Sequence, residues 1–141
     1  EVIGKTSIDW KKKIGRTLGL IDSYKLEDAD YAIVISGFHS TTAKAAVNRM
    51  RAAGKKVGLL RIRVLRPWPA EAIKNALKGV KRIAVFDQSI SLGQHGILYS
   101  ELTKYVSGSD FISLGRYPSE KDFVDVLNRL MAVEKEELVW L

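Results

Sequence analysis

The stretch that decides the fold is Lys55–Pro69, which reads Lys-Lys-Val-Gly-Leu-Leu-Arg-Ile-Arg-Val-Leu-Arg-Pro-Trp-Pro. Its segment Val57–Leu60 is a short apolar run between two lysines and an Arg-x-Arg, a pattern typical of a strand buried on both faces of a parallel sheet. Pro67 and Pro69 have no backbone N–H to donate, so they end the strand region, and Pro69 favours a helix over Ala70–Leu77. The stretch therefore predicts an internal strand followed by a helix.

The same order of apolar run, turn and amphipathic helix recurs on both sides of this stretch. It predicts further strands at Tyr31–Ser36, Arg82–Phe86 and Phe111–Leu114, and helices at Ala43–Ala53, at Ile97–Val106 and from a capping box at Ser119 and Asp122 through Met131. The helix positions that we expect to be buried are Ala43, Ala46, Val47, Met50, Leu98, Leu102, Val106, Phe123, Val126, Leu127 and Leu130. Successive strands joined by short crossovers are usually neighbours, so we expect Val57–Leu60 between Tyr31–Ser36 and Arg82–Phe86.

The N-terminal part of the chain predicts a helix and a connection. Residues Ile8–Leu20 place Ile8, Ile14 and Leu18 on roughly one helical face, which indicates an amphipathic helix. Residues Asp22–Asp30 are polar and acidic, so we expect them to run over the surface as a connection.

The chain length and its C-terminal tail bound the architecture. At 141 residues, positions 1–141 form one domain, and the start at Glu1 instead of a Met suggests a fragment of a longer polypeptide. The tail Leu138–Leu141 is almost wholly apolar, so we expect it to dock on its own sheet or on a partner. We predict a three-layer α/β/α domain with a mostly parallel sheet of about five strands, the fifth lying in Glu134–Leu141 or at Glu1–Ile3.

Composition excludes several classes of site. The chain has no cysteine, so it offers no disulfide, thiolate nucleophile or cysteine-ligated cluster. The net charge of +7 arises from 23 basic and 16 acidic residues, and apart from Lys11–Lys13 the basic residues are scattered without interleaved aromatics. This pattern indicates solvated surface, or a face that meets an acidic subunit, and no nucleic-acid partner. No apolar run is long enough to span a bilayer, so we expect a cytoplasmic protein with no membrane partner.

Any ligand site should lie in the three loops after the strands, because ligands of parallel sheets gather at the carboxyl ends. These loops are Gly37–Thr42, Arg61–Pro69 and Asp87–Gly96, and their candidate binding or interface residues are Gly37, Ser40, Thr42, Arg63, Arg66, Asp87, Ser89, Ser91 and Gly93. The first loop has no phosphate-binding glycine motif, which favours helix capping by Ser or Thr over an anion site. His39 and His95, with Asp87 as the nearest carboxylate, favour loop capping over a metal site. We expect no catalytic residue and no metal ligand in this chain.

With the loops laid out, the sequence resembles a known family. Gly54–Pro69, followed by Val80–Gly93, looks like the second domain of the alpha subunit of pyruvate:ferredoxin oxidoreductase and related 2-oxoacid:ferredoxin oxidoreductases, a domain similar to the carboxyl-terminal domain of transketolase. Asp28–Tyr31 and Leu114–Arg116 fit the same pattern, and the resemblance covers roughly residues 10–130.

The resemblance implies membership of a thiamine-diphosphate enzyme that converts a 2-oxoacid and coenzyme A to acyl-CoA and CO2 and passes electrons through iron–sulfur clusters to ferredoxin. The family's Gly-Asp-Gly signature for diphosphate and magnesium is absent from this chain, which implies that other domains hold thiamine diphosphate, magnesium and the clusters. This chain would then be a non-catalytic domain that packs against other domains and subunits. Two alternatives remain open: a free-standing anion- or nucleotide-binding module built on the first loop, and the equivalent domain of a transketolase or 2-oxoacid dehydrogenase.

Overall fold

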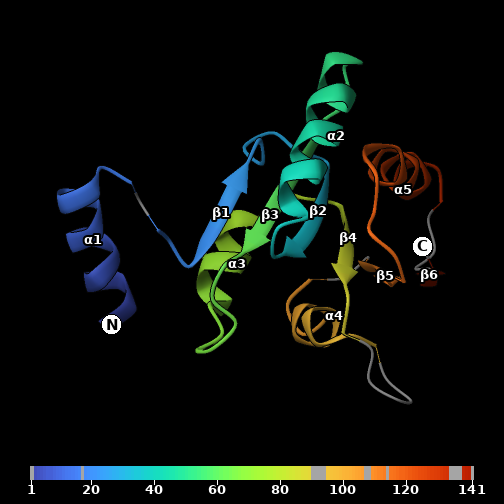
Figure 1. Ribbon diagram of the computed structural model, residues 1–141. Coiled ribbons are helices and arrows are strands. Elements are labelled where there is room, and N and C mark those ends of the chain that lie inside the picture. Colours follow the sequence, from blue (N-terminus) through green and yellow to red (C-terminus); the bar gives the residue numbers. More distant parts are fainter. Residues whose placement is uncertain are drawn as a thin grey trace.

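A six-stranded sheet with helices on both faces forms the body of the chain (Figure 1). The computed structural model describes residues 2–16, 18–89, 95–106, 109–113, 115–133 and 138–140. The strands are β1 (Ile21–Tyr24), β2 (Tyr31–Ser36), β3 (Val57–Ile62), β4 (Arg82–Asp87), β5 (Ser109–Ser113) and β6 (Leu138–Trp140). The helices are α1 (Val2–Ile14), α2 (Ser40–Ala52), α3 (Ala70–Ala76), α4 (Ile97–Leu102) and α5 (Glu120–Ala132). The prediction of an α/β domain with a mostly parallel sheet is confirmed, with six strands instead of about five.

The strand order is β1-β3-β2-β4-β5-β6, which places β2 at the centre of the three buried strands. Tyr31 is level with Val57 of β3 on one side and with Arg82 of β4 on the other, and both pairings are parallel. The prediction that Val57–Leu60 is internal is confirmed. The prediction that it neighbours Arg82–Phe86 is wrong, because β1 pairs antiparallel with β3 and occupies its other edge.

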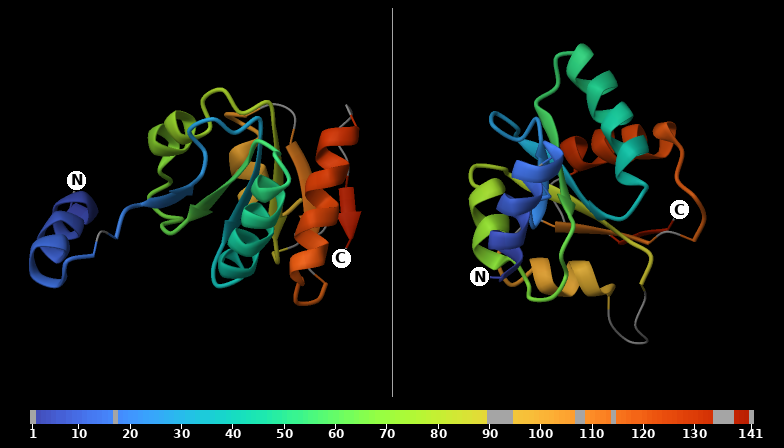
Figure 2. Two further views of the ribbon diagram at one scale, coloured as in Figure 1. Left: turned by 90° about the horizontal axis from the view of Figure 1, so that it is seen from above. Right: turned by 60° about the vertical axis from the view of Figure 1, so that its left-hand side comes forward.

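Each face of the sheet carries its own apolar core. The stripes of α2 and α5 pack on one face, against β-strand residues such as Ile33 and Leu59. Ile73 and Leu77, from α3 and the residue after it, pack on the other face with Leu98 and Leu102 of α4. Figure 2 shows the two helical layers on opposite sides of the strands. The predicted stripes of α2 and α5 are buried throughout, so the three-layer prediction is confirmed.

The boundaries of two predicted helices need correction. The second helix of the chain begins at Ser40 instead of Ala43, and the helix predicted at Ile97–Val106 ends at Leu102. Val106 still packs against the core, from the residues that follow the helix. The capping box is confirmed, because the Ser119 side chain accepts from the Asp122 N–H and the Asp122 side chain accepts from the Ser119 N–H.

The N-terminal predictions are wrong in two respects. The helix spans Val2–Ile14 instead of Ile8–Leu20, so Val2 and Ile3 supply no strand, and Glu1 lies outside the described residues. Within the stretch predicted as a surface connection, Ile21–Tyr24 forms β1 at the edge of the sheet. Ser23 is exposed, whereas Ile21 packs against the core on the side of α3 and α4 and Tyr24 packs against the core on the side of α2 and α5. Helix α1 has no buried residue and stands apart from the sheet in the left view of Figure 2.

The C-terminal tail forms the opposite edge of the sheet. Strand β6 pairs parallel with β5, with Leu138 level with Phe111 and Trp140 level with Ser113. The prediction that the apolar tail docks on its own sheet is confirmed for Leu138–Trp140, whereas residues 134–137 lie outside the described residues. In the described parts of the chain, no helix combines the length and the apolar character that a membrane span requires.

Candidate functional site

The carboxyl ends of β2, β3, β4 and β5 meet at one edge of the sheet. Chain connections run from β2 to β3 on one side and from β4 to β5 on the other, so the topological switch point lies between β2 and β4, where such folds form a crevice. A hollow of about 110 Å³ lies at this point. It is lined by Ile35, Ser36, His39, Phe86, Asp87, Gln88 and Ser89. The structure thus brings the first and third predicted loops together.

The first loop leads tightly from β2 into α2. Gly37 has φ +74°, in the left-handed region that favours glycine, and the Ser40 hydroxyl donates to the Gly37 carbonyl at 2.9 Å. The N-cap of α2 is His39, whose side chain makes no capping hydrogen bond, so the prediction that Ser or Thr caps this helix is wrong. Ser40 is buried in the first turn and Thr42 is half-buried beside it. Both residues belong to the helix itself.

His39 joins the first loop to the third. Its side chain is only 4% exposed, and its Nε2 lies 3.2 Å from Nε2 of Gln88. Burial lowers the pKa of His39, so the ring is neutral at pH 7. A neutral ring can accept a hydrogen bond from the Gln88 amide, which fixes the two loops relative to each other.

In the third loop, Asp87 organises the backbone that follows it. Its carboxylate accepts hydrogen bonds from the Ser89 N–H at 2.9 Å and from the Leu98 N–H at 2.7 Å. A Cβ at Gly96 would overlap this carboxylate and the Ser89 carbonyl, so the position requires glycine. Asp87 is buried, and its carboxylate is used within the chain. The predicted site residues Ser91 and Gly93 lie outside the described residues.

In the second loop, the two predicted arginines pair within this chain. Nη2 of Arg63 lies 3.2 Å from Oδ2 of Asp22, which also binds the Lys44 amine at 3.0 Å. Nη2 of Arg66 lies 2.9 Å from Oε1 of Glu101 on α4, while most of the Arg66 side chain is exposed. No residue of the second loop is among those that line the hollow.

A fourth loop, after β5, was not among the predicted sites and carries Tyr117. Arg116 binds Asp122 through two contacts, Nη1 to Oδ2 at 2.8 Å and Nη2 to Oδ1 at 2.6 Å. The Arg116 guanidinium, together with Ser119, holds the pKa of Asp122 well below its usual range. This ion pair and the capping box anchor the turn that presents Tyr117.

Tyr117 and Phe38 form an exposed aromatic pair over His39. The side chains of Tyr117 and Phe38 are 74% and 66% exposed. The Phe38 ring centroid lies 3.9 Å from that of His39 and 5.9 Å from that of Tyr117. Sequence reasoning missed both residues, although each is a large aromatic just after a strand and outside any helical stripe.

Exposed apolar side chains follow all four of these strands. Phe38 comes after β2, Leu65 after β3, Ile97 after β4 and Tyr117 after β5. The other large apolar side chains described as exposed are Tyr105 and six within residues 2–18. We call the surface made by Phe38, Leu65, Ile97 and Tyr117 the carboxyl-end face. Phe38 and Tyr117 contact each other, and exposed apolar side chains that adjoin in this way mark interaction surfaces.

The described side chains around the carboxyl-end face are suited to binding a partner. Among them, no group of three or more His, Cys, Asp or Glu side chains could hold a metal ion. Arg63 and Arg66 are ion-paired within the chain, Asp87 accepts two backbone hydrogen bonds, and burial lowers the pKa of His39. Apolar contacts and hydrogen bonds to a partner are what this arrangement can supply.

Comparison with known proteins gives a family match. The model of the pyruvate:ferredoxin oxidoreductase core domain II matches residues 29–119, more than half of the chain. The alpha subunit of NADH-dependent phenylglyoxylate dehydrogenase from Aromatoleum evansii is 42% identical over 102 residues, which are 71% of this chain and 24% of that protein. Pyruvate synthase subunit PorA from Methanocaldococcus jannaschii is 34% identical over 140 residues, which are 94% of this chain and 36% of that protein.

A solved structure has the same fold. The 2-oxoglutarate:ferredoxin oxidoreductase from Magnetococcus marinus superposes with a TM-score of 0.68 at 16% identity, over 92% of this chain and 23% of that one. The chain spans only 24–36% of the length of curated relatives such as these. The family model and the relatives agree with the resemblance found in the sequence. This chain belongs to the pyruvate:ferredoxin oxidoreductase core domain II family.

Proposed function

We propose that this chain is a non-catalytic assembly domain of a thiamine-diphosphate-dependent 2-oxoacid:ferredoxin oxidoreductase. The complete enzyme would convert a 2-oxoacid, with pyruvate as the first candidate, and coenzyme A to acyl-CoA and CO2, with reduction of ferredoxin. The domain would belong to the alpha subunit and contact other domains and subunits of the complex. Family membership supports the enzyme class, and the relatives named above are themselves subunits of oxidoreductases.

The observation that carries the assembly role is the carboxyl-end face. An exposed aromatic pair keeps apolar surface in contact with water, which is unfavourable. The same pair stabilises an interface, where buried aromatic anchors contribute about 2 kcal/mol or more each to binding. Five of the predicted site residues shape the loops that expose Phe38 and Ile97. These residues are Gly37, Ser40, Thr42, Asp87 and Ser89. Arg63 and Arg66 lie in the loop that carries Leu65 of the carboxyl-end face. We propose that Ser91 and Gly93 also shape a loop of this interface.

The donor set of this chain does not fit the cofactors of the complete enzyme. Iron–sulfur clusters are held mainly by cysteine thiolates, and the chain has no cysteine. The diphosphate of thiamine diphosphate is bound through a divalent cation held by several oxygen ligands, and the described residues contain no cluster of three candidate ligands. We therefore assign thiamine diphosphate, magnesium and the clusters to other parts of the enzyme.

The hollow between β2 and β4 argues against the alternative of an anion- or nucleotide-binding module. Its described lining includes the Asp87 carboxylate and no Lys or Arg. His39 is neutral and adds no positive charge. A carboxylate without a compensating cation repels phosphate, so the start of α2 is poorly suited to hold one.

The test is native purification of the chain from cells that carry it, with and without changes in the face. Phe38→Ser/Tyr117→Ser should leave the thermal unfolding of the chain nearly unchanged, because both side chains are exposed. It should lower the co-purifying, thiamine-diphosphate-dependent oxidation of 2-oxoacid at least tenfold, as loss of two aromatic anchors predicts. Tyr105→Ser is the matched control, since Tyr105 is also an exposed aromatic but lies outside the face.

The readout distinguishes the enzyme class from the assembly role. Supplying ferredoxin or NAD⁺ as alternative acceptors identifies the electron acceptor. Absence of 2-oxoacid oxidation from the wild-type preparation would refute the enzyme assignment. Equal activity in the double variant and in Tyr105→Ser would refute the role of the carboxyl-end face.

A further inference from the structure

Helix α1 has an apolar row that the rest of the described chain leaves uncovered. Val2 and Trp10 are 77% and 42% exposed, and no residue of the helix is buried. Ile3, Ser7, Trp10 and Ile14 follow the i, i+4, i+7, i+11 spacing that aligns side chains on one helical face. An isolated helix of this length is marginal in water, so it needs a packing partner.

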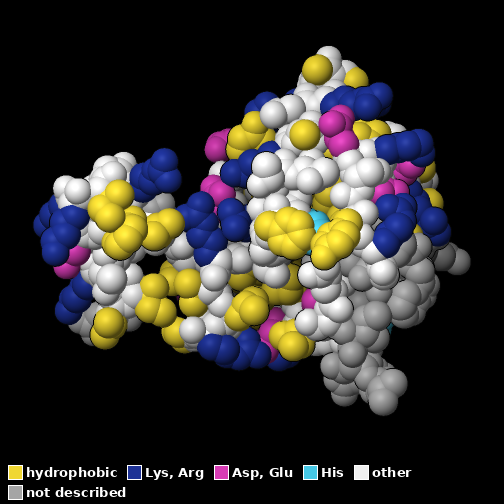
Figure 3. All heavy atoms as spheres, viewed as in Figure 1, with side chains coloured by type: hydrophobic (Ala, Val, Ile, Leu, Met, Phe, Trp, Pro, Cys, Tyr) yellow, Lys and Arg dark blue, Asp and Glu magenta, His cyan; other side chains and the backbone are white. Residues whose placement is uncertain are grey.

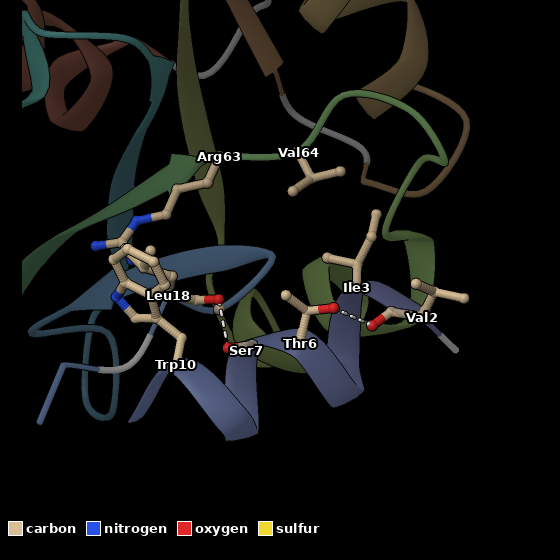
Figure 4. A pocket seen from close by; sticks show the side chains of 9 residues that line it. Val2, Ile3, Thr6, Ser7, Trp10, Leu18, Arg63 and Val64 are labelled. Carbon is tan, nitrogen blue, oxygen red and sulfur yellow. Dashed lines mark hydrogen bonds between the residues drawn. The ribbon is translucent and has the colours of Figure 1, made fainter. Parts of the chain in front are cut away.

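This apolar row faces the domain across an open groove (Figure 4). The groove measures about 390 Å³ and is larger than the hollow between β2 and β4. One wall is formed by α1, which contributes three residues of the row together with two neighbours: Val2, Ile3, Thr6, Ser7 and Trp10. The other wall consists of Leu18, Gly19, Arg63 and Val64 at the ends of β1 and β3. Figure 3 shows hydrophobic side chains on α1 and on the body of the domain, on either side of a gap. The two walls are tethered, because the Ser7 hydroxyl donates to the Leu18 carbonyl.

The charge beside the groove indicates the occupant. Residues 2–16 carry five basic side chains and one carboxylate, so this short segment holds +4 of the chain's net +7. On the helix, Lys11 and Lys13 flank the apolar row on its two sides. A second copy of this basic chain would bring like charges together in the groove. An acidic segment would instead place opposite charges on both flanks.

The shape of the groove distinguishes a protein segment from a bilayer. An interfacial helix buries a convex apolar face in lipid, with nothing between that face and the membrane. The apolar row of α1 instead forms one wall of a concave groove, which a flat lipid surface does not fill. A narrow, apolar ridge with flanking carboxylates fits both the shape and the charge.

We infer that α1 and its groove bind an acidic amphipathic segment of another domain or subunit of the oxidoreductase. This inference rests on the proposed function and names a second contact surface, separate from the carboxyl-end face. The segment would seat its apolar side chains between Trp10 and Val64 and its Asp or Glu side chains against Lys11 and Lys13.

The chain has no cysteine, so a single introduced thiol reports on one position. Thr6→Cys places the thiol in the groove, and Ile8→Cys places it on the opposite face of the same helix, at a position that is also exposed. Phe38→Cys reports on the carboxyl-end face. Alkylation rates are measured by mass spectrometry of this chain's own peptides, in the native complex and in the free chain.

In the complex, we expect Thr6→Cys to react at least tenfold more slowly than Ile8→Cys, whereas the two react alike in the free chain. Neutralising Lys11 and Lys13 to Ser should remove most of this protection. The same change at Lys55 and Lys56, remote from the groove, should not. A photo-crosslinker at position 6 should join a peptide with apolar residues at i, i+3 and i+4 between carboxylates.

Four outcomes would overturn the inference. Equal reactivity of Thr6→Cys and Ile8→Cys in the complex, with Phe38→Cys protected, refutes the groove contact alone. Full reactivity at all three positions refutes the proposed function as well. A crosslink to a second copy of this chain, or protection by vesicles of anionic phospholipid alone, would assign the groove to a different occupant.

Discussion

Gly58 of β3 lies directly beneath the backbone of Lys25. A Cβ at position 58 would come within 2.6 Å of the Lys25 carbonyl oxygen and 2.7 Å of Cδ2 of Leu26. The loop from β1 to β2 therefore crosses over β3 in contact with its backbone. This close approach explains why a glycine interrupts the apolar run of a buried strand.

Gly58→Ala should destabilise the chain by about 1–3 kcal/mol, because either the Lys25 backbone or β3 must move to admit a methyl group. Urea unfolding followed by circular dichroism measures the change. Gly4→Ala is the control: nothing lies within 4 Å of a Cβ at that position, and α1 packs on no core. Equal urea unfolding midpoints for Gly58→Ala and Gly4→Ala would contradict the close approach of the Lys25 backbone to Gly58.

Leu60→Asp should prevent folding. Leu60 is 0% exposed in the core shared with α3 and α4, and an unpaired carboxylate there costs several kcal/mol against a total stability of about 5–15 kcal/mol. Ile8→Asp, on the exposed face of α1, should fold normally. One-dimensional NMR of both variants decides the matter, and a dispersed spectrum for Leu60→Asp would show the position to be less buried than described.

The ion pair of Arg116 and Asp122 predicts a dependence of stability on pH. Arg116 and Ser119 lower the pKa of Asp122 in the folded chain, so the pair contributes its full stabilisation above the unfolded pKa of about 3.9. The contribution is lost as the pH falls below that value and the carboxylate becomes protonated. The difference in urea midpoint between wild type and Asp122→Asn should therefore be largest at pH 5–7 and shrink toward pH 2.

Asp125→Asn is the control for this titration. Its partner Lys121 is largely exposed, and exposed pairs at i, i+4 on a helix contribute about 0.3–0.5 kcal/mol. A gap between wild type and Asp122→Asn that stays constant from pH 7 to pH 2 would show that the carboxylate charge plays no part in the turn.

Arg66→Ala should leave the fold of the free chain nearly unchanged while weakening assembly of the complete enzyme. The Arg66 side chain is 61% exposed beside Leu65 of the carboxyl-end face, and its pair with Glu101 is at the surface, where such pairs contribute about 0–1 kcal/mol. Thermal unfolding and analytical gel filtration of the complex measure the two effects. Unchanged assembly would exclude Arg66 from the interface.

The free chain should not bind thiamine diphosphate. Calorimetry with thiamine diphosphate and magnesium should show no saturable heat at micromolar concentrations, because the described residues contain no cluster of ligands for the metal. Inorganic diphosphate with magnesium controls for nonspecific attraction to a basic chain. Saturable micromolar binding of thiamine diphosphate would contradict a non-catalytic role.

The sequence predicts the parts of the fold that depend on local pattern. Strand β2 and the buried stripes of α2 and α5 match the predictions because continuous apolar runs and 3.6-residue periodicity arise from neighbouring residues. Strand β1 was missed because its Asp22 looks like a loop residue. Only the folded chain brings Lys44 and Arg63 to that carboxylate, from positions distant in sequence.

The candidate site divides in the same way. Sequence placed the first and third loops at one edge of the sheet, and the hollow between His39 and Asp87 joins them. It did not identify Phe38 and Tyr117, because the exposure of an aromatic side chain depends on whether residues distant in sequence cover it in the folded chain. It also grouped Ile8 with Ile14 on one helical face, although residues six apart in a helix lie about 120° apart around its axis.

The strand order also fixes when each strand can first find a partner during synthesis on the ribosome. Strands β1 and β2 are complete by residue 36, yet in the described sheet each hydrogen-bonds to strands that come later and not to the other. A nascent chain that ends at residue 56 therefore holds two strands of this sheet and no pair. Emergence of β3 supplies a neighbour to both at once, so the sheet assembles around β3, and β1 and β2 stay unpaired until β3 has been made.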